Sequence, residues 1–167
     1  MRAIIRNGPR RLGGPRTGFT ILSSAVADKI NETFPGSGCQ DSEPCDNPRI
    51  DPSLPLISQF GWQFENRIFQ AESGLTGLTE IVFLVGGAER GLLLPSATFL
   101  AGLRTPSGLE VGVGPNVSLS GAAYAFTVGM NNEFGEMNLP INIATVLGQD
   151  GPRVSLLVGF NTSERRY

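Results

Sequence analysis

Between Leu109 and Met130 the chain alternates between apolar residues and small or polar ones. The apolar positions, interrupted only by the Ser120-Gly121 turn, are Leu109, Val111, Val113, Val117, Leu119, Ala122, Tyr124, Phe126, Val128 and Met130. Residues between them are mostly Gly, Ser, Asn, Ala and Thr. A period of two is typical of β-strands whose two faces differ, because successive side chains point to opposite sides. This segment therefore predicts two antiparallel strands joined by a short turn.

The same alternation recurs along most of the chain after residue 55. The predicted strands are Arg16–Ser23, Leu56–Phe69, Leu78–Val85, Ser96–Arg104, Leu109–Leu119, Ala122–Asn131, Met137–Leu147 and Arg153–Phe160. Only Leu78–Val85 is apolar on both faces. Short turn signals rich in Gly, Pro, Asp and Ser separate the strands, which predicts pairing of consecutive neighbours. We expect an all-β protein, an antiparallel meander closing into a roughly eight-stranded β-barrel with one short N-terminal helix.

The length of 167 residues suits a single domain with a sizeable core. We expect a disordered basic arm over 1–15, one barrel domain over 16–160 and a polar tail over 161–167. Within the domain, a short helix is predicted over 25–34, capped by Ser24, followed by a polar loop over 35–55 that contains both cysteines. The first 16 residues show no apolar run typical of a secretory signal, and no run approaches the ~20 apolar residues of a membrane helix.

Composition excludes several functional classes. Histidine is absent, which removes Ser-His-Asp and Cys-His catalysis and histidine metal sites. The net charge of −2 gives no electrostatic reason to expect nucleic acid as a partner. Only 17% of residues are charged, whereas soluble β-proteins usually place many charges on their outer faces and edges. We expect an outer surface that is not wholly aqueous, with no enzymatic activity, cofactor or metal.

The two faces of the strands differ in the size of their side chains. The polar face is small, as expected for the interior of an eight-stranded barrel, which is only just wide enough for side chains. Its candidate lumen residues are Glu65, Arg67, Arg104, Glu110, Asn116, Asn142 and Arg153. The other face carries the candidate lipid-facing aromatics Phe60, Trp62, Phe64, Phe99, Tyr124 and Phe126. This inverted pattern is typical of outer-membrane barrels.

Three prolines favour the opposite arrangement. Pro115 falls within a predicted strand, while Pro95 and Pro140 fall near strand starts. Each removes a hydrogen-bond donor from the sheet, which is costly in lipid. A β-bulge at Pro115 would ease this cost. A soluble periplasmic barrel or sandwich, with the apolar face lining a pocket for a lipid or other apolar ligand, is therefore the alternative.

Four segments carry a resemblance. They are Gln59–Glu65, Leu94-Pro95-Ser96 with the Gly-Leu-Arg that follows, Gly112–Asn116 and Leu139–Asn142. Together they resemble a group of uncharacterised bacterial envelope β-proteins, over roughly Thr17 to Phe160. The architecture is similar to small eight-stranded outer-membrane barrels, and Arg153–Phe160 resembles their last strand, although seven polar residues follow it. The resemblance implies a location in the bacterial outer membrane or periplasm and no catalytic residues.

Cys39 and Cys45 lie in the polar loop, and we expect a local disulfide with free thiols as the alternative. Two cysteines without histidine make a zinc site improbable. The acidic residues around them are Asp41, Glu43, Asp46 and Asp51. They offer Ca²⁺ ligands but match no EF-hand spacing, so a solvated acidic loop is the favoured interpretation.

Carboxylates and arginines share the polar faces of the strands. Glu65, Glu110 and Glu136 share these faces with the arginines already named. A buried carboxylate pair could perform acid–base chemistry, but structural ion pairs across the lumen are the favoured interpretation. The glycine runs lie within or between strands, not between a strand and a helix, which excludes a nucleotide-binding loop.

Three functional classes follow. The first is a small outer-membrane barrel with a structural, assembly or surface role, as a single unit or as a subunit of a larger envelope complex, with the lipid bilayer as its partner. The second is the soluble barrel with an apolar ligand. The third is a lipid-modifying envelope enzyme, ranked last because no nucleophile constellation is recognisable.

Overall fold

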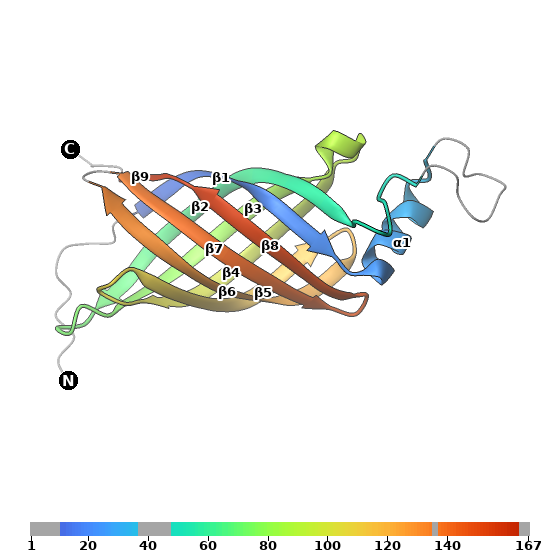
Figure 1. Ribbon diagram of the computed structural model, residues 1–167. Helices are drawn as coiled ribbons and strands as arrows, with labels where there is room; N and C mark the ends of the chain where they lie inside the picture. Colours follow the sequence, from blue (N-terminus) through green and yellow to red (C-terminus); the bar gives the residue numbers. More distant parts are fainter. Residues whose placement is uncertain (1–10, 37–47, 135–136, 164–167) are drawn as a thin grey trace.

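The computed structural model describes residues 11–36, 48–134 and 137–163. Eight strands form a closed antiparallel β-barrel, which confirms the predicted fold class (Figure 1). The strands are β1 (Arg11–Leu22), β2 (Leu56–Gln70), β3 (Thr76–Gly86), β4 (Leu94–Arg104), β5 (Leu109–Ser118), β6 (Gly121–Phe134), β7 (Met137–Gly148) and β8 (Gly151–Gly159). Each pairs with the next, and β1 closes the barrel by pairing with both β2 and β8.

The two ends of the barrel differ. The helix α1 (Ser24–Thr33), the 3-10 turn η1 (Ala88–Arg90) and the β5–β6 and β7–β8 turns lie at one end, here called the α1 end (Figure 1). The short strand β9 (Asn161–Ser163) lies at the other, here called the β9 end, and pairs with β1 and β7. The β2–β3 and β4–β5 turns are also at the β9 end (Figure 1).

The first strand is longer than the sequence predicts. It begins at Arg11, so Arg11–Pro15, assigned above to the basic arm, pair with β2 in regular register. Leu12 points inward and is buried. The Gly-Gly-Pro stretch at 13–15 has low strand propensity, and pairing with a neighbour overrides it. Asn161–Ser163, assigned to the polar tail, form β9 in the same way; residues 1–10 and 164–167 lie outside the described residues.

The helix is confirmed but is displaced by one residue from its predicted bounds. Ser23, not Ser24, is its N-cap, and its Oγ accepts a hydrogen bond from the Val26 N–H at 3.4 Å. A helix of ten residues has little stability of its own, so packing decides whether it forms. The apolar cluster that holds it to the barrel consists of Leu22, Val26, Ala27, Ile50, Ile57 and Leu92.

No bulge forms at Pro115, which corrects the bulge suggested above. The pairings Thr98–Asn116 and Ala101–Val113 keep one register across β4 and β5, and Pro115 pairs with Tyr124 on β6. Gly114 lets the strands approach closely here, since a Cβ on it would lie 1.9 Å from the Phe99 carbonyl oxygen. The register shift in β2 falls instead between Arg67 and Phe69.

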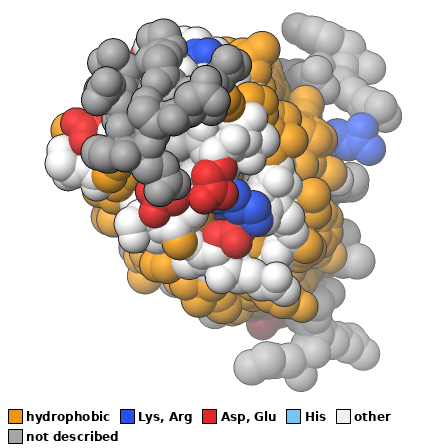
Figure 2. All heavy atoms as spheres, turned by 90° about the vertical axis from the view of Figure 1, so that its right-hand side faces the viewer, with side chains coloured by type: hydrophobic (Ala, Val, Ile, Leu, Met, Phe, Trp, Pro, Cys, Tyr) orange, Lys and Arg blue, Asp and Glu red, His pale blue; other side chains and the backbone are white. Residues whose placement is uncertain are grey.

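The bulky apolar side chains of the strands point outward. All six predicted aromatics lie on the outer surface, with exposed fractions from 46% for Trp62 to 64% for Tyr124. Among strand residues whose side chains the structure describes, Arg11 at the β9 end is the only exposed charged one. Figure 2, which looks onto the α1 end, shows hydrophobic side chains around the circumference, with polar surface and a small group of acidic and basic side chains nearer the middle. The outer face is therefore a nearly uncharged apolar belt.

Candidate binding site

The lumen is divided into three levels along the barrel axis. A cluster of charged side chains fills the part nearer the β9 end, and a cavity opens toward the α1 end. An apolar layer separates the two and consists of Val82, Leu84, Leu100, Ala125, Val146 and Leu157. The levels follow from the strand register, because pairing brings inward positions on neighbouring strands to similar depths.

Arg104 is the centre of the charged cluster. It binds Glu65 with two parallel hydrogen bonds, Nη1 to Oε1 at 2.7 Å and Nη2 to Oε2 at 2.6 Å. Its Nε also donates to Glu110 Oε2 at 2.7 Å. All three residues are at most 6% exposed and come from β4, β2 and β5. Bidentate arginine–carboxylate pairs are among the strongest charge-assisted contacts, so this cluster fastens three strands together.

Glu80 on β3 adds a third carboxylate to the cluster. Carboxylate oxygens of Glu65, Glu80 and Glu110 lie within 4.8 Å of one another, a spacing that could hold a cation. However, Arg104 already engages both oxygens of Glu65 and one of Glu110. This arrangement is that of a buried ion-pair network rather than a metal centre.

Arg16 extends the network across the barrel closure. Its Nε donates to Gln63 Oε1 and its Nη2 to Asn161 Oδ1, both at 2.8 Å. The guanidinium thereby links β1 to β2 and to β9, and its side chain is almost fully buried. Arg16, Gln63, Glu80 and Asn161 are absent from the residues singled out by sequence. Arg16 and Asn161 stand at the two ends of the predicted barrel domain, where the alternation gives no clear face. Glu80 lies in a strand that is apolar on both faces.

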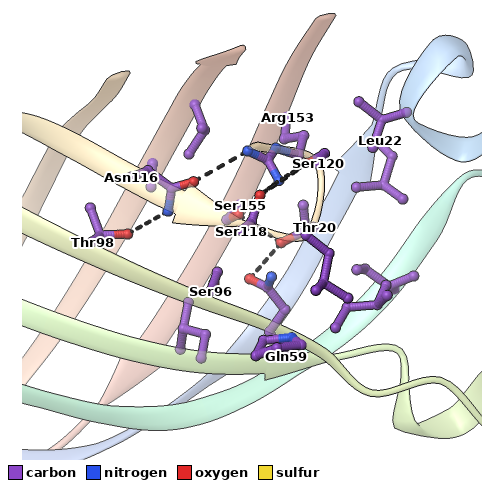
Figure 3. A pocket seen from close by; sticks show the side chains of 18 of the residues that line it. Thr20, Leu22, Gln59, Ser96, Thr98, Asn116, Ser118, Ser120, Arg153 and Ser155 are labelled. Atoms are coloured by element: carbon purple, nitrogen blue, oxygen red, sulfur yellow. Dashed lines mark hydrogen bonds between the residues drawn. The ribbon is translucent and has the colours of Figure 1, made fainter. Parts of the chain in front are cut away.

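The cavity lies on the other side of the apolar layer and has a volume of about 230 Å³. Figure 3 shows the polar side chains of its wall, which come from strands on opposite sides of the barrel. They include Thr20, Gln59, Ser96, Thr98, Asn116, Ser118, Ser120, Arg153 and Ser155. Residues Leu22, Val26, Ile30, Ile57 and Leu94, beneath and on α1, form an apolar side of the mouth.

Two hydrogen-bonded groups order the polar wall (Figure 3). In the first, Thr20 Oγ1 donates to Gln59 Oε1 at 2.7 Å and lies 2.6 Å from Ser155 Oγ. In the second, Arg153 Nη1 donates to Ser118 Oγ at 2.8 Å and to Ser120 Oγ at 2.9 Å, while Nη2 donates to Asn116 Oδ1 at 3.2 Å. The cavity thus has ordered polar walls and an apolar floor, the usual combination in ligand pockets.

The seven candidate lumen residues all point inward, but they belong to different places. Glu65, Arg104 and Glu110 form the charged cluster, and Arg67 Nε lies 3.9 Å from Glu65 Oε1 beside it. Asn116 and Arg153 line the cavity. The seventh residue, Asn142 on β7, faces Gly129 of β6 inside the barrel, where a Cβ on the glycine would meet its Oδ1.

Most of the remaining candidates lie in the polar loop. The candidates that fall outside the described residues are Cys39, Cys45, Asp41, Glu43, Asp46 and, elsewhere in the chain, Glu136. The disulfide therefore stays a prediction.

Asp51 is exposed, and its carboxylate accepts hydrogen bonds from the side chain and the backbone of Ser53, which lower its pKa. This contact closes a local turn and gathers no second acidic group. Among the residues that the structure describes, no helix is long and apolar enough to cross a membrane.

Comparison with known proteins adds no relative. A scan against protein-family models, a search of curated proteins and a search of solved structures each give no match. The resemblance to bacterial envelope β-proteins therefore stays a prediction, and the case for function rests on the belt, the charged cluster and the cavity.

Proposed function

We propose that this chain is a small β-barrel that inserts into a membrane through its apolar belt, with the bacterial outer membrane as its location. The observation that carries the proposal is the outward orientation of the bulky side chains together with the near absence of charge among them. Soluble monomers rarely expose contiguous apolar patches larger than a few hundred Å². In a bilayer the same surface would be buried against acyl chains.

The backbone supports the same conclusion. A membrane protein has to satisfy its peptide groups internally, and closure of the barrel removes both sheet edges. The eight barrel strands contain between 9 and 15 residues. A tilted strand needs about 9–11 residues to cross the hydrocarbon core. Their lengths are therefore sufficient for a crossing.

The charged cluster favours a structural, assembly or surface role over a channel. Ion pairs among Arg104, Glu65 and Glu110 fill the lumen near the β9 end, and Arg16 with its amide partners lies beside them. A network of this kind cross-braces the strands. The soluble alternative, in which the bulky face lines a pocket, does not fit the outward aromatics; it would require another protein to cover the belt.

Trp62 offers a direct test, because it is the chain's single tryptophan and lies near the middle of β2 on the outer face. The purified protein is refolded into phosphatidylcholine vesicles whose acyl chains carry bromine, a contact quencher of tryptophan fluorescence. We expect strong quenching relative to unbrominated vesicles.

The matched control is the double variant Trp62→Phe, Gln149→Trp, which moves the fluorophore to the exposed β7–β8 turn. Its fluorescence should change little with acyl-chain bromination. A folded, monodisperse protein in detergent-free buffer, with Trp62 unquenched by vesicles, would overturn the proposal. Quenching that appears only after a bound partner protein is removed would favour the soluble alternative, in which another protein covers the belt.

A further inference from the structure

Lys29 and Arg153 both line the cavity, and Arg153 is the one whose hydrogen bonds all end on neutral oxygens. Its acceptors are the hydroxyls of Ser118 and Ser120 and the amide oxygen of Asn116. Asp150, the acid that precedes it by three residues, forms an ion pair with Lys29 at 2.5 Å. No ion pair of Arg153 is found among the described residues. A partly buried cation in this setting is electrostatically complementary to an anion.

Arg153 has N–H donors left over that are able to bind an anion. A guanidinium carries five N–H groups, and the three hydrogen bonds use both hydrogens of Nη1 and one of Nη2. Within the described residues, Nε and the second hydrogen of Nη2 have no acceptor. Nε and Nη2 are neighbouring nitrogens of the guanidinium, and their two remaining N–H groups are able to donate to a carboxylate.

The other end of the cavity is apolar. Its floor is the layer that includes Val82, Leu100, Ala125 and Leu157, while Arg153 lies near the mouth, two residues into β8 from the α1 end. A ligand that enters from this end would meet the cation first and the apolar layer at greater depth. This polarity is that of an amphiphile with its head at the mouth.

The volume limits the size of the ligand. A cavity of about 150 Å³ binds benzene, so one of about 230 Å³ accommodates on the order of ten non-hydrogen atoms. This space suits a single chain of medium length and excludes a complete two-chain lipid.

We propose that the cavity at the α1 end binds a small amphiphile with one anionic head, of the class of medium-chain carboxylates. The carboxylate accepts from Nε and Nη2 of Arg153, and the alkyl chain lies on the apolar floor. The proposal does not depend on membrane insertion, because the cavity is inside the barrel.

The probe is octanoate labelled with ¹³C at its carboxyl carbon, added to the full chain in lipid nanodiscs or, for a chain that is soluble, in detergent-free buffer. Empty nanodiscs or buffer alone give the signal without protein. We expect a bound ¹³C resonance that saturates. Octylamine, with an alkyl chain of the same length and the opposite charge, should not displace octanoate. Butyrate should bind at least about tenfold more weakly, because it buries four fewer CH₂ groups on the floor.

Two variants test the two parts of the site. Arg153→Met keeps the side chain long but removes the charge, and we expect the affinity for octanoate to fall by about tenfold or more. Ala125→Phe fills the floor and should abolish the bound resonance. Arg90→Met is the control, because it removes an arginine at the same end of the barrel that does not line the cavity.

Thermal unfolding of each variant shows whether it is folded. Ala144→Leu, a smaller obstruction of the same cavity, replaces Ala125→Phe if that variant does not fold. Saturable binding that is lost in the Arg153 and floor variants but kept in Arg90→Met supports the proposal. Three results would overturn it. They are an octanoate signal no larger than that without protein, displacement by octylamine as effective as that by unlabelled octanoate, and unchanged octanoate affinity in Arg153→Met.

Discussion

Arg104 and Arg153 lie in different halves of the lumen, and their hydrogen-bonding groups are satisfied differently. Arg104, toward the β9 end, is enclosed by two carboxylates that accept its hydrogen bonds and balance its charge. Arg153, toward the α1 end, contacts hydroxyls and an amide and keeps donors available. The first arrangement is complete without a ligand, whereas the second leaves charge and space unfilled. The same residue type can therefore stabilise one half of a barrel and form a receptive site in the other.

The largest effect on stability should come from removing Arg104. In Arg104→Met, Glu65 and Glu110 would remain buried without their partner, and breaking a buried pair in this way costs about 3–5 kcal/mol. We expect urea-induced unfolding in lipid vesicles to show a corresponding loss of stability. A loss below about 1 kcal/mol would mean that the cluster does not stabilise the barrel and that the contrast between the halves fails.

A smaller loss is expected for Arg153→Met in the same unfolding assay. Its acceptors line an open cavity, so water can replace the lost hydrogen bonds, and we expect a cost of about 1 kcal/mol. This variant also makes the ligand-affinity measurement interpretable, because it should remain folded. A loss of stability as large as that of Arg104→Met would assign Arg153 a structural role and remove the distinction between the two arginines.

The smallest change, and one of opposite sign, is expected for Glu80→Gln. Its carboxylate lies close to those of Glu65 and Glu110, and its Oε1 has no hydrogen-bond partner among the described residues. Replacing one of three clustered acids with an isosteric amide relieves repulsion, so we expect no loss or a gain of up to about 1 kcal/mol. A clear destabilisation would show that Glu80 contributes to the network through its charge.

The period of two was sufficient to predict the barrel, because it repeats over most of the chain and its turns are short. The sequence also separated a bulky face from a small polar one, and the structure places the first outside and the second inside. The ends of elements were less predictable: Gly13, Gly14 and Pro15 conceal the start of β1, and adjacent serines conceal which of them caps α1.

The pairing of lumen residues could not be predicted, because the partners are distant in the chain. Arg104 and Glu65 are separated by 39 residues, and Arg16 and Asn161 by 145. Their meeting depends on the register and tilt of several strands, which alternation alone does not fix. For this reason Glu65 and Arg153 looked equivalent in sequence, although they belong to different levels of the lumen.

The pairing of β1 with β8 has a kinetic consequence. The first strand cannot be completed on both sides until the last long strand has been synthesised, so the closing contacts join the two ends of the barrel sequence. Such non-local contacts slow folding, and a partly assembled sheet keeps two edges and an apolar face exposed. A chain with this topology would depend on lipid or a chaperone to shield it until the ends meet.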